Sequence, residues 1–306
     1  MSVLVVGGTG FIGREVMRRL ARRGEKTIGF DINPRRSALA DLGEAVTIVA
    51  GDATKFDDLA AAVVDHKVDR IINLAYILGE GETMPHRAVQ VDVVAMDNCF
   101  EITRLFGVKR CVFASSIAYH GPSQEPFGDR PVTEDDPGYP GGIYVDTKQF
   151  NERLAAGYNA LYGTSIVALR PPFVMGPAKP RGVMDHVEII TRPALGLPVR
   201  SPSREDAPYI VGHVGDIAEM FVRLTLAEAP HHTVYHAGGH TTTLGELAAL
   251  VRQQIPAADI EFNPAGRGGF LVHRVDNSRI VGEFEVAHRS LAQLVADIIE
   301  DTRRLT

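Results

Sequence analysis

The chain has 306 residues, of which 45% are hydrophobic and 23% are charged, and its formal net charge is −6. This length accommodates one large α/β unit and a smaller second lobe. The acidic balance provides no basic surplus for nucleic acid, and no apolar run approaches the ~18 residues of a membrane helix. Because the first predicted strand begins at Ser2 or Val3, we expect no secretory leader and a cytoplasmic location.

The N-terminal residues predict a strand, a glycine turn and a helix. A β-branched apolar run leads into GGTGFIG at residues 7–13, and a helical pattern continues to Arg23. In this context Gly7 permits a sharp turn, Gly10 lets the backbone approach a pyrophosphate, and Gly13 lets the helix pack closely. The helix N-terminus then faces the phosphates. A glycine turn without a ligand is the alternative, and the second strand argues against it.

That second strand, predicted over residues 27–30, is followed by Asp31. A carboxylate at this place accepts hydrogen bonds from both ribose hydroxyls of NAD and repels the 2′-phosphate of NADP. Arg35 and Arg36 lie close by and would soften that repulsion, although basic residues at a helix start are usually solvated. We therefore predict NAD as the cofactor, in preference to NADP.

Strands and helices alternate over the next 130 or so residues, which predicts right-handed βαβ units on a parallel sheet. The predicted strands cover residues 46–50, 70–75, 109–114 and 165–169, and the predicted helices cover 37–42, 56–64, 88–106 and 144–162. The fold class is therefore α/β, a doubly wound parallel sheet of Rossmann type. Asp52 follows the third strand, where it either meets the adenine edge of a dinucleotide or caps the following turn. Ligands bind beyond the carboxyl ends of such strands, so Gly7, Asp31, Asp52, Ala75 and Ser116 are expected at one rim.

The division into domains is placed near Pro171-Pro172, where regular structure is expected to stop. Residues 174–209 are rich in Pro and Gly, with one helical patch at 187–192. A helix with Asp216 as N-cap, a strand over 233–237, and helices over 244–255 and 291–303 are expected next. We predict an NAD-binding domain of residues 1–173, which also receives about 211–236. Residues 174–210 and 237–306 would form a smaller, mixed α/β substrate-binding cap.

Tyr144 and Lys148 lie one helical turn apart and project from one helix face. Tyrosine is a poor base at its ordinary pKa of about 10, but a neighbouring ammonium, or the positive nicotinamide, favours the phenolate. Tyr144 would then take the proton of a substrate hydroxyl while hydride leaves its carbon. Ser116 would hold the same oxygen through a hydrogen bond. A surface pair without function is the alternative, and the glycine motif, Asp31 and the serine pair disfavour it.

Several motifs together span most of the chain: GGTGFIG (7–13), Asp31, GDAT (51–54), NLAY (73–76), SSIAYHG (115–121), YVDTK (144–148), LRPPFVMGP (169–177) and HVGDIA (213–218). The sequence resembles the extended short-chain dehydrogenase/reductase superfamily, in its NAD-dependent epimerase/dehydratase group. The resemblance implies that Tyr144 is the acid/base, that Lys148 binds the nicotinamide ribose and Tyr144, and that Ser116 binds the substrate oxygen.

The resemblance also implies the other cofactor contacts and the assembly. The implied contacts are Phe11 and Ile12 on the pyrophosphate beside Gly7, Gly10 and Gly13, Asp31 on the adenosine ribose, Asp52 and Ala53 on adenine, and Leu74 and Ala75 along the cofactor. It implies a homodimer in which the helices near 88–106 and 144–162 pair between subunits.

Three places depart from the pattern of nucleotide-sugar members of that group. Phe173 stands where an Asn is usual, and Asp92 replaces the usual Asn that opens the fourth large helix. Residues 203–209 replace a segment whose Arg grips the diphosphate. In this segment Glu205 and Asp206 would repel a diphosphate, and Arg204 would serve only from a shifted position.

Two groups of potentially reactive residues receive structural interpretations. Four histidines, His231, His232, His236 and His240, suggest a metal cluster by spacing. A predicted strand and Gly238-Gly239 separate them, so we predict no metal. The two cysteines of the chain, Cys99 and Cys111, fall in a helix and a strand and are expected to be buried, reduced thiols.

The sequence therefore predicts an NAD-dependent oxidoreductase that interconverts a secondary alcohol and a carbonyl in a small polar molecule of the sugar-acid or hydroxy-acid type. The second interpretation is an epimerase or dehydratase of a sugar or nucleotide sugar, which oxidises its substrate transiently with tightly bound NAD. The third is an NAD-sensing module without turnover, against which the Tyr144–Lys148 pair argues because binding alone needs no acid/base.

Overall fold

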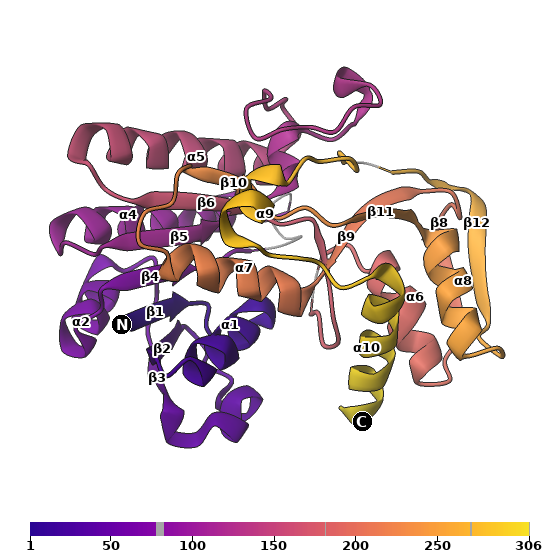
Figure 1. The fold of residues 1–306 in the computed structure, drawn as a ribbon, viewed down its shortest axis with the longest axis horizontal. Helices are drawn as coiled ribbons and strands as arrows, with labels where there is room; N and C mark the ends of the chain where they lie inside the picture. The colour runs from indigo at the N-terminus through magenta and orange to yellow at the C-terminus, as the bar shows by residue number, and fades with distance from the viewer. Residues whose placement is uncertain (78–82, 181, 270, 306) are drawn as a thin grey trace.

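The computed structural model describes residues 1–77, 83–180, 182–269 and 271–305 (Figure 1). Its main element is a seven-stranded parallel sheet with the order β3-β2-β1-β4-β5-β6-β10. The strands are β1 (Ser2–Val6), β2 (Lys26–Asp31), β3 (Val46–Ala50), β4 (Arg70–Asn73), β5 (Arg110–Ala114), β6 (Ile166–Arg170) and β10 (Val234–His236). The strand order reverses between β1 and β4, so the doubly wound, Rossmann-type α/β fold is confirmed.

Helices cover both faces of this sheet because successive strand residues point to opposite sides. Val3 and Val5 of β1 pack towards α1 (Phe11–Arg22) and α7 (Val214–Leu226). Leu4 and Val6 pack on the other face, towards α2 (Phe56–His66) and α4 (Ala95–Leu105), and α5 (Ile143–Tyr162) contributes to the same core. All of these strand side chains are fully buried, which explains why the strands read as continuous apolar runs.

The register of the sheet places the strand ends at one rim. Val6 of β1 lies opposite Phe30 of β2 and Asn73 of β4, and Asn73 lies opposite Phe113 of β5. The residues that follow these strands therefore emerge side by side, as predicted for the ligand-binding edge of a parallel sheet.

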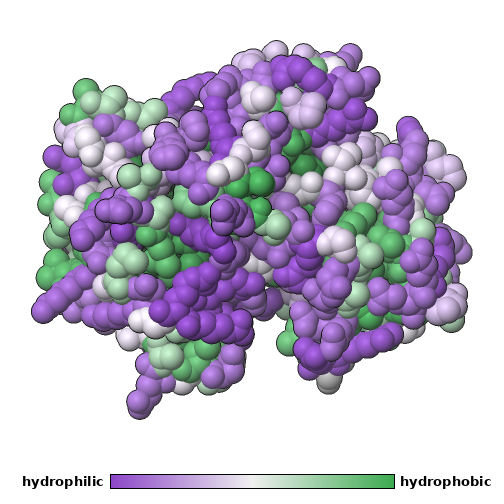
Figure 2. Space-filling view, in the orientation of Figure 1, coloured by the Kyte–Doolittle hydropathy of each residue, from purple (hydrophilic) through white to green (hydrophobic). Residues whose placement is uncertain are grey.

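A second region lies beside the sheet, and we call it the cap (Figure 1). It contains the three-stranded sheet β11-β9-β7 and the pair β12-β8. Its elements are β7 (Phe173–Met175), α6 (Asp185–Ala194), β8 (Val199–Ser203), β9 (Pro208–His213), β11 (His240–Thr243), α8 (Leu244–Gln254), β12 (Ile260–Arg267) and α10 (Leu291–Arg304). Their buried side chains form a separate hydrophobic cluster. Figure 2 shows a notch between the two regions at one edge of the molecule.

The prediction that regular structure largely stops after Pro171-Pro172 is wrong. β7 begins directly after these prolines and pairs with β9, and β8 pairs with β12. Pairing partners that are distant in sequence supply hydrogen bonds that local propensity does not reveal. β9 also crosses the expected boundary at residue 210. A short helix, α9 (Ser278–Phe284), packs against α7 and β10 and therefore lies on the seven-stranded sheet.

The helix predicted over residues 88–106 is divided into three parts. α3 (Pro85–Val89) leads into a wider turn with π-type hydrogen bonds (Gln90–Val94), and α4 follows. Asp92 lies in this wide turn and is buried. Such turns occur often at functional sites. The polar helix predicted over 37–42 is a kinked 3₁₀ segment, Arg36–Ala45.

The helix start predicted at Asp216 is also wrong. α7 begins at Val214, and the N-cap is His213, whose Nδ1 accepts the Gly215 N–H at 3.0 Å. Asp216 binds Arg289 instead, with its carboxylate 2.8 Å from the guanidinium. Thr243 and Glu246 form a capping box at the start of α8. This agrees with the sequence pattern, in which a Thr is followed three residues later by a Glu.

The cysteine prediction is confirmed, because both thiols are free and buried. Across the described residues, none of the helices combines the length and apolar character needed to cross a membrane.

Candidate active site

The glycine turn joins β1 to α1 through contacts that leave no room for side chains. Gly7 has a φ of +77°, and its N–H donates to the Phe30 carbonyl at 2.8 Å. A Cβ on Gly13 would lie only 2.1 Å from the Gly7 oxygen. Helix α1 begins after Gly10 with no side-chain cap and no acidic residue in its first turn, which contains Phe11 and Ile12. Its first N–H groups are therefore available to an anion such as a pyrophosphate.

Asp31 lies at the end of β2 beside this turn. Its carboxylate accepts hydrogen bonds from the Thr9 hydroxyl at 2.6 Å and from the Asn33 N–H at 3.3 Å. The Thr9 hydroxyl in turn accepts the Arg35 N–H at 3.2 Å. Arg36 binds the Ile48 carbonyl and does not pair with Asp31. The carboxylate is thus held at the rim, and its contact with a ribose stays a prediction.

The next two strand ends lie on either side of the same turn. Asp52 accepts the N–H and the hydroxyl of Thr54, so it does cap the turn after β3. Its contact with adenine, together with that of Ala53, stays a prediction. After β4, Leu74 and Ala75 pack against the backbone of Gly7. The glycine turn, the Asp31 carboxylate and these backbone segments together fit a dinucleotide.

Tyr144 and Ser116 meet above the end of β5. The Ser116 side chain lies close enough to the Tyr144 hydroxyl to influence its pKa, and the Ser116 oxygen also accepts the Ala118 N–H at 3.1 Å. Burial raises the pKa of Tyr144, and Ser116 lowers it in part. The structure therefore brings these two predicted catalytic side chains next to each other, which sequence spacing alone could not establish.

Lys148 lies one turn further along α5 and is buried. Its ammonium donates to the Ala114 carbonyl at 2.7 Å and lies 5.5 Å from the centre of the Tyr144 ring. Burial lowers the pKa of Lys148, and the carboxylates of Asp92 and Glu152 act in the opposite direction. At these distances the ammonium favours the phenolate form of Tyr144.

Tyr76 and Asp92 are parts of the site to which the sequence analysis gave no role. The Tyr76 ring lies 3.3 Å from the Lys148 ammonium and packs edge-on against the Tyr144 ring, with centroids 5.4 Å apart. Its hydroxyl is hydrogen-bonded to Thr147. The Asp92 carboxylate accepts the Ile77 N–H at 2.7 Å, and burial raises its pKa. The only signals for Tyr76 were its place after β4 and the NLAY motif, and for Asp92 its departure from the usual Asn.

A buried polar network lies behind the site. Arg170 makes a double hydrogen bond to Glu152, at 2.8 and 2.6 Å, and its guanidinium also contacts His120 at 3.0 Å. Ser115 donates to the same Glu152 carboxylate. The Nε2 atoms of His120 and His236 are 2.9 Å apart, and burial lowers the pKa of both rings. Within the part of the chain that the structure describes, no group of three or more histidine, cysteine or carboxylate side chains could hold a metal ion.

The cap presents an aromatic cluster next to this site. The Phe173 ring packs against the rings of Tyr209 and His186, with centroids 5.0 and 5.1 Å apart. Phe173 follows Pro171, whose carbonyl accepts the N–H of Ile117, the residue after Ser116. The cluster is therefore connected, through Pro171, to the segment that carries Ser116, and we call it the cap wall.

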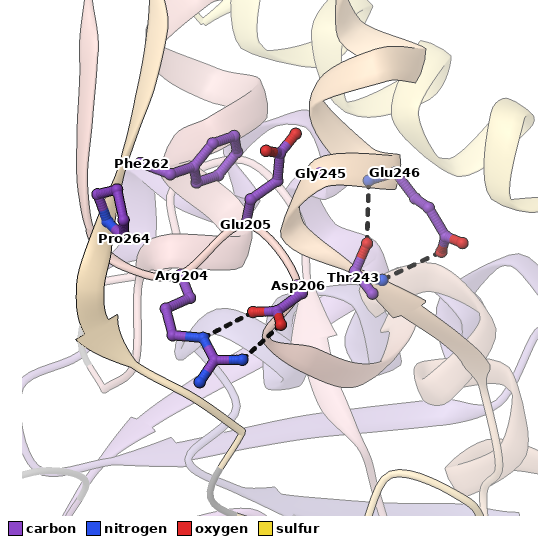
Figure 3. A pocket seen from close by; sticks show the side chains of 8 residues that line it. All are labelled: Arg204, Glu205, Asp206, Thr243, Gly245, Glu246, Phe262 and Pro264. Carbon is purple, nitrogen blue, oxygen red and sulfur yellow. Dashed lines mark hydrogen bonds and ion pairs between the residues drawn. The ribbon is translucent and has the colours of Figure 1, made fainter.

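A pocket of about 700 Å³ lies farther out in the cap (Figure 3). Arg204 points towards Asp206, and the two form an ion pair. Glu205 and Glu246 add further carboxylates to the lining, while Phe262 and Pro264 form the apolar side. The pocket is thus acidic, and its one guanidinium already has a partner. This arrangement does not suit a diphosphate.

The family profile described as "NAD dependent epimerase/dehydratase family" matches residues 3–238. The chain belongs to this family. NAD is therefore its cofactor, as predicted, and the recognition of the superfamily from its motifs is confirmed.

Curated relatives of the chain show moderate identity. The protein CapI of Staphylococcus aureus is 29% identical over 58% of this chain, and the UDP-glucose 4-epimerase of Lacticaseibacillus casei is 29% identical over 61%. The matched parts cover 55% and 56% of those proteins, so the chain spans about half the length of these relatives.

Solved structures resemble the chain over its whole length. The L-threonine dehydrogenase of Cupriavidus necator in its holo form is 25% identical, with a TM-score of 0.86 and coverage of 98% and 99%. The UDP-glucose 4-epimerase of Thermus thermophilus in complex with NAD is 22% identical, with a TM-score of 0.86 and full coverage of both chains. The latter likeness concerns the fold.

Proposed function

We propose that the protein is an NAD-dependent oxidoreductase that interconverts a secondary alcohol and a carbonyl in a small polar substrate of the hydroxy-acid or sugar-acid type. The observation that carries the proposal is the juxtaposition of three side chains: the Lys148 ammonium lies 5.5 Å from the centre of the Tyr144 ring, and Ser116 is close enough to influence the pKa of the Tyr144 hydroxyl. An acid/base, a hydrogen-bond donor and a cation at one strand end suit proton transfer to and from a substrate oxygen.

The proposed reaction assigns one task to each of the three side chains. Bound NAD supplies the hydride acceptor. In the oxidative direction the Tyr144 phenolate takes the proton of the substrate hydroxyl, while Ser116 donates a hydrogen bond to the same oxygen. Lys148 stabilises the phenolate electrostatically and binds the nicotinamide ribose. In the reductive direction Tyr144 returns the proton to the carbonyl oxygen.

The proposed cofactor contacts follow the rim of the sheet. The pyrophosphate lies against the glycine turn and the start of α1, at Gly7, Gly10, Phe11, Ile12 and Gly13. The adenosine ribose is bound by Asp31, and adenine contacts Asp52 and Ala53. The remaining part of the cofactor lies along Leu74 and Ala75. We further propose that the seven-stranded sheet region binds the cofactor and that the cap binds the substrate.

The alternative proposal is an epimerase or dehydratase of a sugar or nucleotide sugar. The observation that favours it is the similarity to UDP-glucose 4-epimerases. The cap supports it less, because Phe173 fills a wall position with an apolar ring and Arg204 is paired with Asp206 beside two further carboxylates. The L-threonine dehydrogenase of Cupriavidus necator, whose chain matches over almost its full length, supports net oxidation.

One assay separates the two proposals. The protein is mixed with NAD and a panel of hydroxy acids, sugar acids, polyols, L-threonine and UDP-glucose, and the absorbance of NADH is followed together with product analysis. We expect stoichiometric NADH formation with a hydroxy acid or sugar acid. Product formation without NADH accumulation, from any member of the panel, would instead establish the epimerase or dehydratase.

We also propose a homodimer formed through α4 and α5, in the cytoplasm. Large apolar side chains on and after these helices are exposed, and they include Leu105, Phe106, Phe150, Leu161 and Tyr162. An exposed apolar surface of this kind marks an interface. Light scattering is expected to give twice the chain mass of 33.2 kDa, and a mass of one chain would reject the dimer. The proposed cytoplasmic location has a separate basis. The two cysteines are free, buried thiols, as expected in a reducing compartment.

A further inference from the structure

Lys179, in the loop between β7 and α6, is a cation without an anionic partner among the described residues. Its ammonium donates to the Val183 carbonyl at 3.2 Å and to Nε2 of His186 at 3.1 Å. His186 is fully buried, and burial and the neighbouring Lys179 hold its pKa well below its usual value, so the ring is neutral. Burial lowers the pKa of Lys179 to about 8, and no described charge offsets this effect. A charge in such surroundings is stabilised when an opposite charge joins it.

The loop that carries Lys179 lies along the cap wall of the candidate active site. At its start, Pro177 accepts a hydrogen bond from Arg14 of α1 at 2.7 Å, and Gly176 packs against the Phe11 ring. The side chain of Lys179 reaches His186, whose ring packs on Phe173. The ammonium therefore contacts the cap wall through His186, and the start of its loop contacts the first turn of α1.

The described surroundings of Lys179 favour a small anion with one charge. Among the described residues, Lys179 is a single ammonium beside a neutral ring, and no described guanidinium joins it to form a fork for a phosphate. The next carboxylate along α6, Asp185, is already bound by Ser203 and Arg267, and the outer cap adds Glu205 and Asp206. Among the described residues, a diphosphate would meet one unpaired cation and several carboxylates, whereas a carboxylate needs only the one cation.

We propose that Lys179, held in place by His186 and the Val183 carbonyl, binds the carboxylate of the substrate. The proposal rests on the proposed function, because it completes the same site, and it narrows the substrate class. The molecule would carry its secondary alcohol at Tyr144 and Ser116 and a carboxylate at Lys179. Neutral polyols of the same size would bind weakly.

Calorimetric titration of the NAD-loaded protein with matched pairs of compounds tests the proposal. The pairs are 3-hydroxybutyrate with 1,3-butanediol, and D-gluconate with sorbitol. We expect at least one carboxylate to bind tenfold or more tightly than its neutral counterpart. Lys179→Met should weaken that carboxylate about tenfold and leave the neutral compound unchanged, and Lys179→Arg should retain affinity within about fivefold. Lys109→Met, which removes an exposed lysine of the sheet region, is the matched control.

Three results would overturn the proposal. The first is the absence of a carboxylate preference in every pair, and the second is an unchanged carboxylate affinity in Lys179→Met. The third is a tenfold loss of NAD affinity in that variant, which would assign the ammonium to the cofactor. Binding of a carboxylate does not require NADH formation. If a carboxylate binds through Lys179 but no NADH forms, the role of Lys179 stands and net oxidation is rejected. If NADH forms without any preference for carboxylates, net oxidation stands and the role of Lys179 is rejected.

A measurement on the unsubstituted protein covers the case in which Lys179→Met fails to fold. Lysines are reductively methylated with ¹³C-formaldehyde, and the Lys179 resonance is assigned by its absence in Lys179→Arg. We expect the carboxylate that binds, but not its neutral counterpart, to shift this resonance. A resonance that responds to neither compound would reject the contact.

Discussion

The rim of the seven-stranded sheet and the wall of the cap differ in how strictly geometry constrains their residues. At the rim, a Cβ on Gly13 would meet the Gly7 oxygen at 2.1 Å, so only glycine fits. In the cap, Phe173, His186 and Tyr209 fill space with rings whose centres are 5.0 to 5.5 Å apart, and other side chains of similar volume could do the same. The comparison shows that the identity of the cofactor can be predicted from this sequence, because the turn that binds it accepts only glycine at a given position. The identity of the substrate cannot be predicted in the same way, because the cap residues follow no general sequence pattern.

The largest effect is expected for Tyr144→Phe, which removes the proposed acid/base and keeps the ring. The turnover number should fall about 10³-fold, because general acid–base catalysis contributes 10²–10⁴-fold. NAD affinity should stay within a few fold of the unsubstituted protein. The measurement is steady-state NADH formation combined with NAD titration by calorimetry. Tyr76→Phe keeps the ring beside Lys148 and is the matched control, with at most a modest loss. A fully active Tyr144→Phe would show that another group is the base.

Gly13→Ala tests the constraint at the rim. The added methyl group would overlap the Gly7 carbonyl and displace the turn, so we expect a loss of roughly 1–3 kcal/mol in unfolding free energy and weaker NAD binding. Gly157→Ala is the control within α5, where a Cβ meets nothing within 4 Å. Because glycine is unfavourable in a helix interior, this control should be stabilised by up to about 1 kcal/mol. Chemical denaturation measures both, and equal behaviour of the two variants would contradict the account of the turn.

Asp31→Ala tests the proposed contact between the rim of the sheet and the adenosine ribose of the cofactor. Hydrogen bonds to a charged group contribute about 1.5–3 kcal/mol, so NAD affinity should fall by roughly 10- to 100-fold. NADP affinity should fall less or rise, because the repulsion of its 2′-phosphate is removed. Parallel titrations with the two cofactors give the answer. An unchanged ratio of the NAD and NADP affinities would show that Asp31 does not bind the ribose.

A smaller effect is expected where the two regions are joined by an ion pair. Burial opposes ionisation of Asp216 at the start of α7, but its hydrogen bonds to Arg289 outweigh this and hold its pKa below the usual value. A carboxyl whose pKa is depressed in the folded state stabilises the protein above its unfolded-state pKa and loses that contribution as the pH falls. Asp216→Asn should therefore lower the melting temperature by a few degrees at pH 7, and the difference should shrink below about pH 4.

The control for this pair is Asp259→Asn, which breaks the exposed pair of Arg200 and Asp259 in the cap. Solvent screens such pairs, so we expect no measurable change of melting temperature at any pH. Thermal unfolding followed by circular dichroism at pH 7, 5, 4 and 3 covers both variants. A constant difference for Asp216→Asn down to pH 3 would contradict the assignment of the stabilisation to the ionised carboxylate.

The sequence was sufficient for those parts of the fold in which local pattern and tertiary structure agree. The parallel strands, the glycine turn and the contact of α5 with the end of β5 follow from buried apolar runs and motif spacing. β7, β8 and β9 were missed because their pairing partners are distant in sequence and their segments are rich in proline and glycine. Asp216 was expected to cap α7 and binds Arg289 instead, because a partner 73 residues away outcompetes the local one.

The candidate site was predictable to a similar extent. Tyr144, Lys148 and Ser116 could be named from spacing and from the ends of predicted strands. Tyr76 could not be given a role, because an aromatic residue after a strand has no periodic signal, and its place over the Lys148 ammonium depends on three-dimensional packing. No role could be predicted for Lys179 either, because a lysine in a loop is ordinarily solvated. Only its contact with His186 in the folded protein separates it from such a surface lysine.

The central claim is that the tips of separate parallel strands bring the nicotinamide ribose, Tyr144 and Lys148 into one site. A crystal structure of the complex with NAD tests this most directly. We predict the Tyr144 hydroxyl and the Lys148 ammonium within hydrogen-bond distance of the nicotinamide ribose, about 2.6–3.2 Å. A dinucleotide bound elsewhere, or bound at the glycine turn with both side chains out of contact with its ribose, would contradict the account.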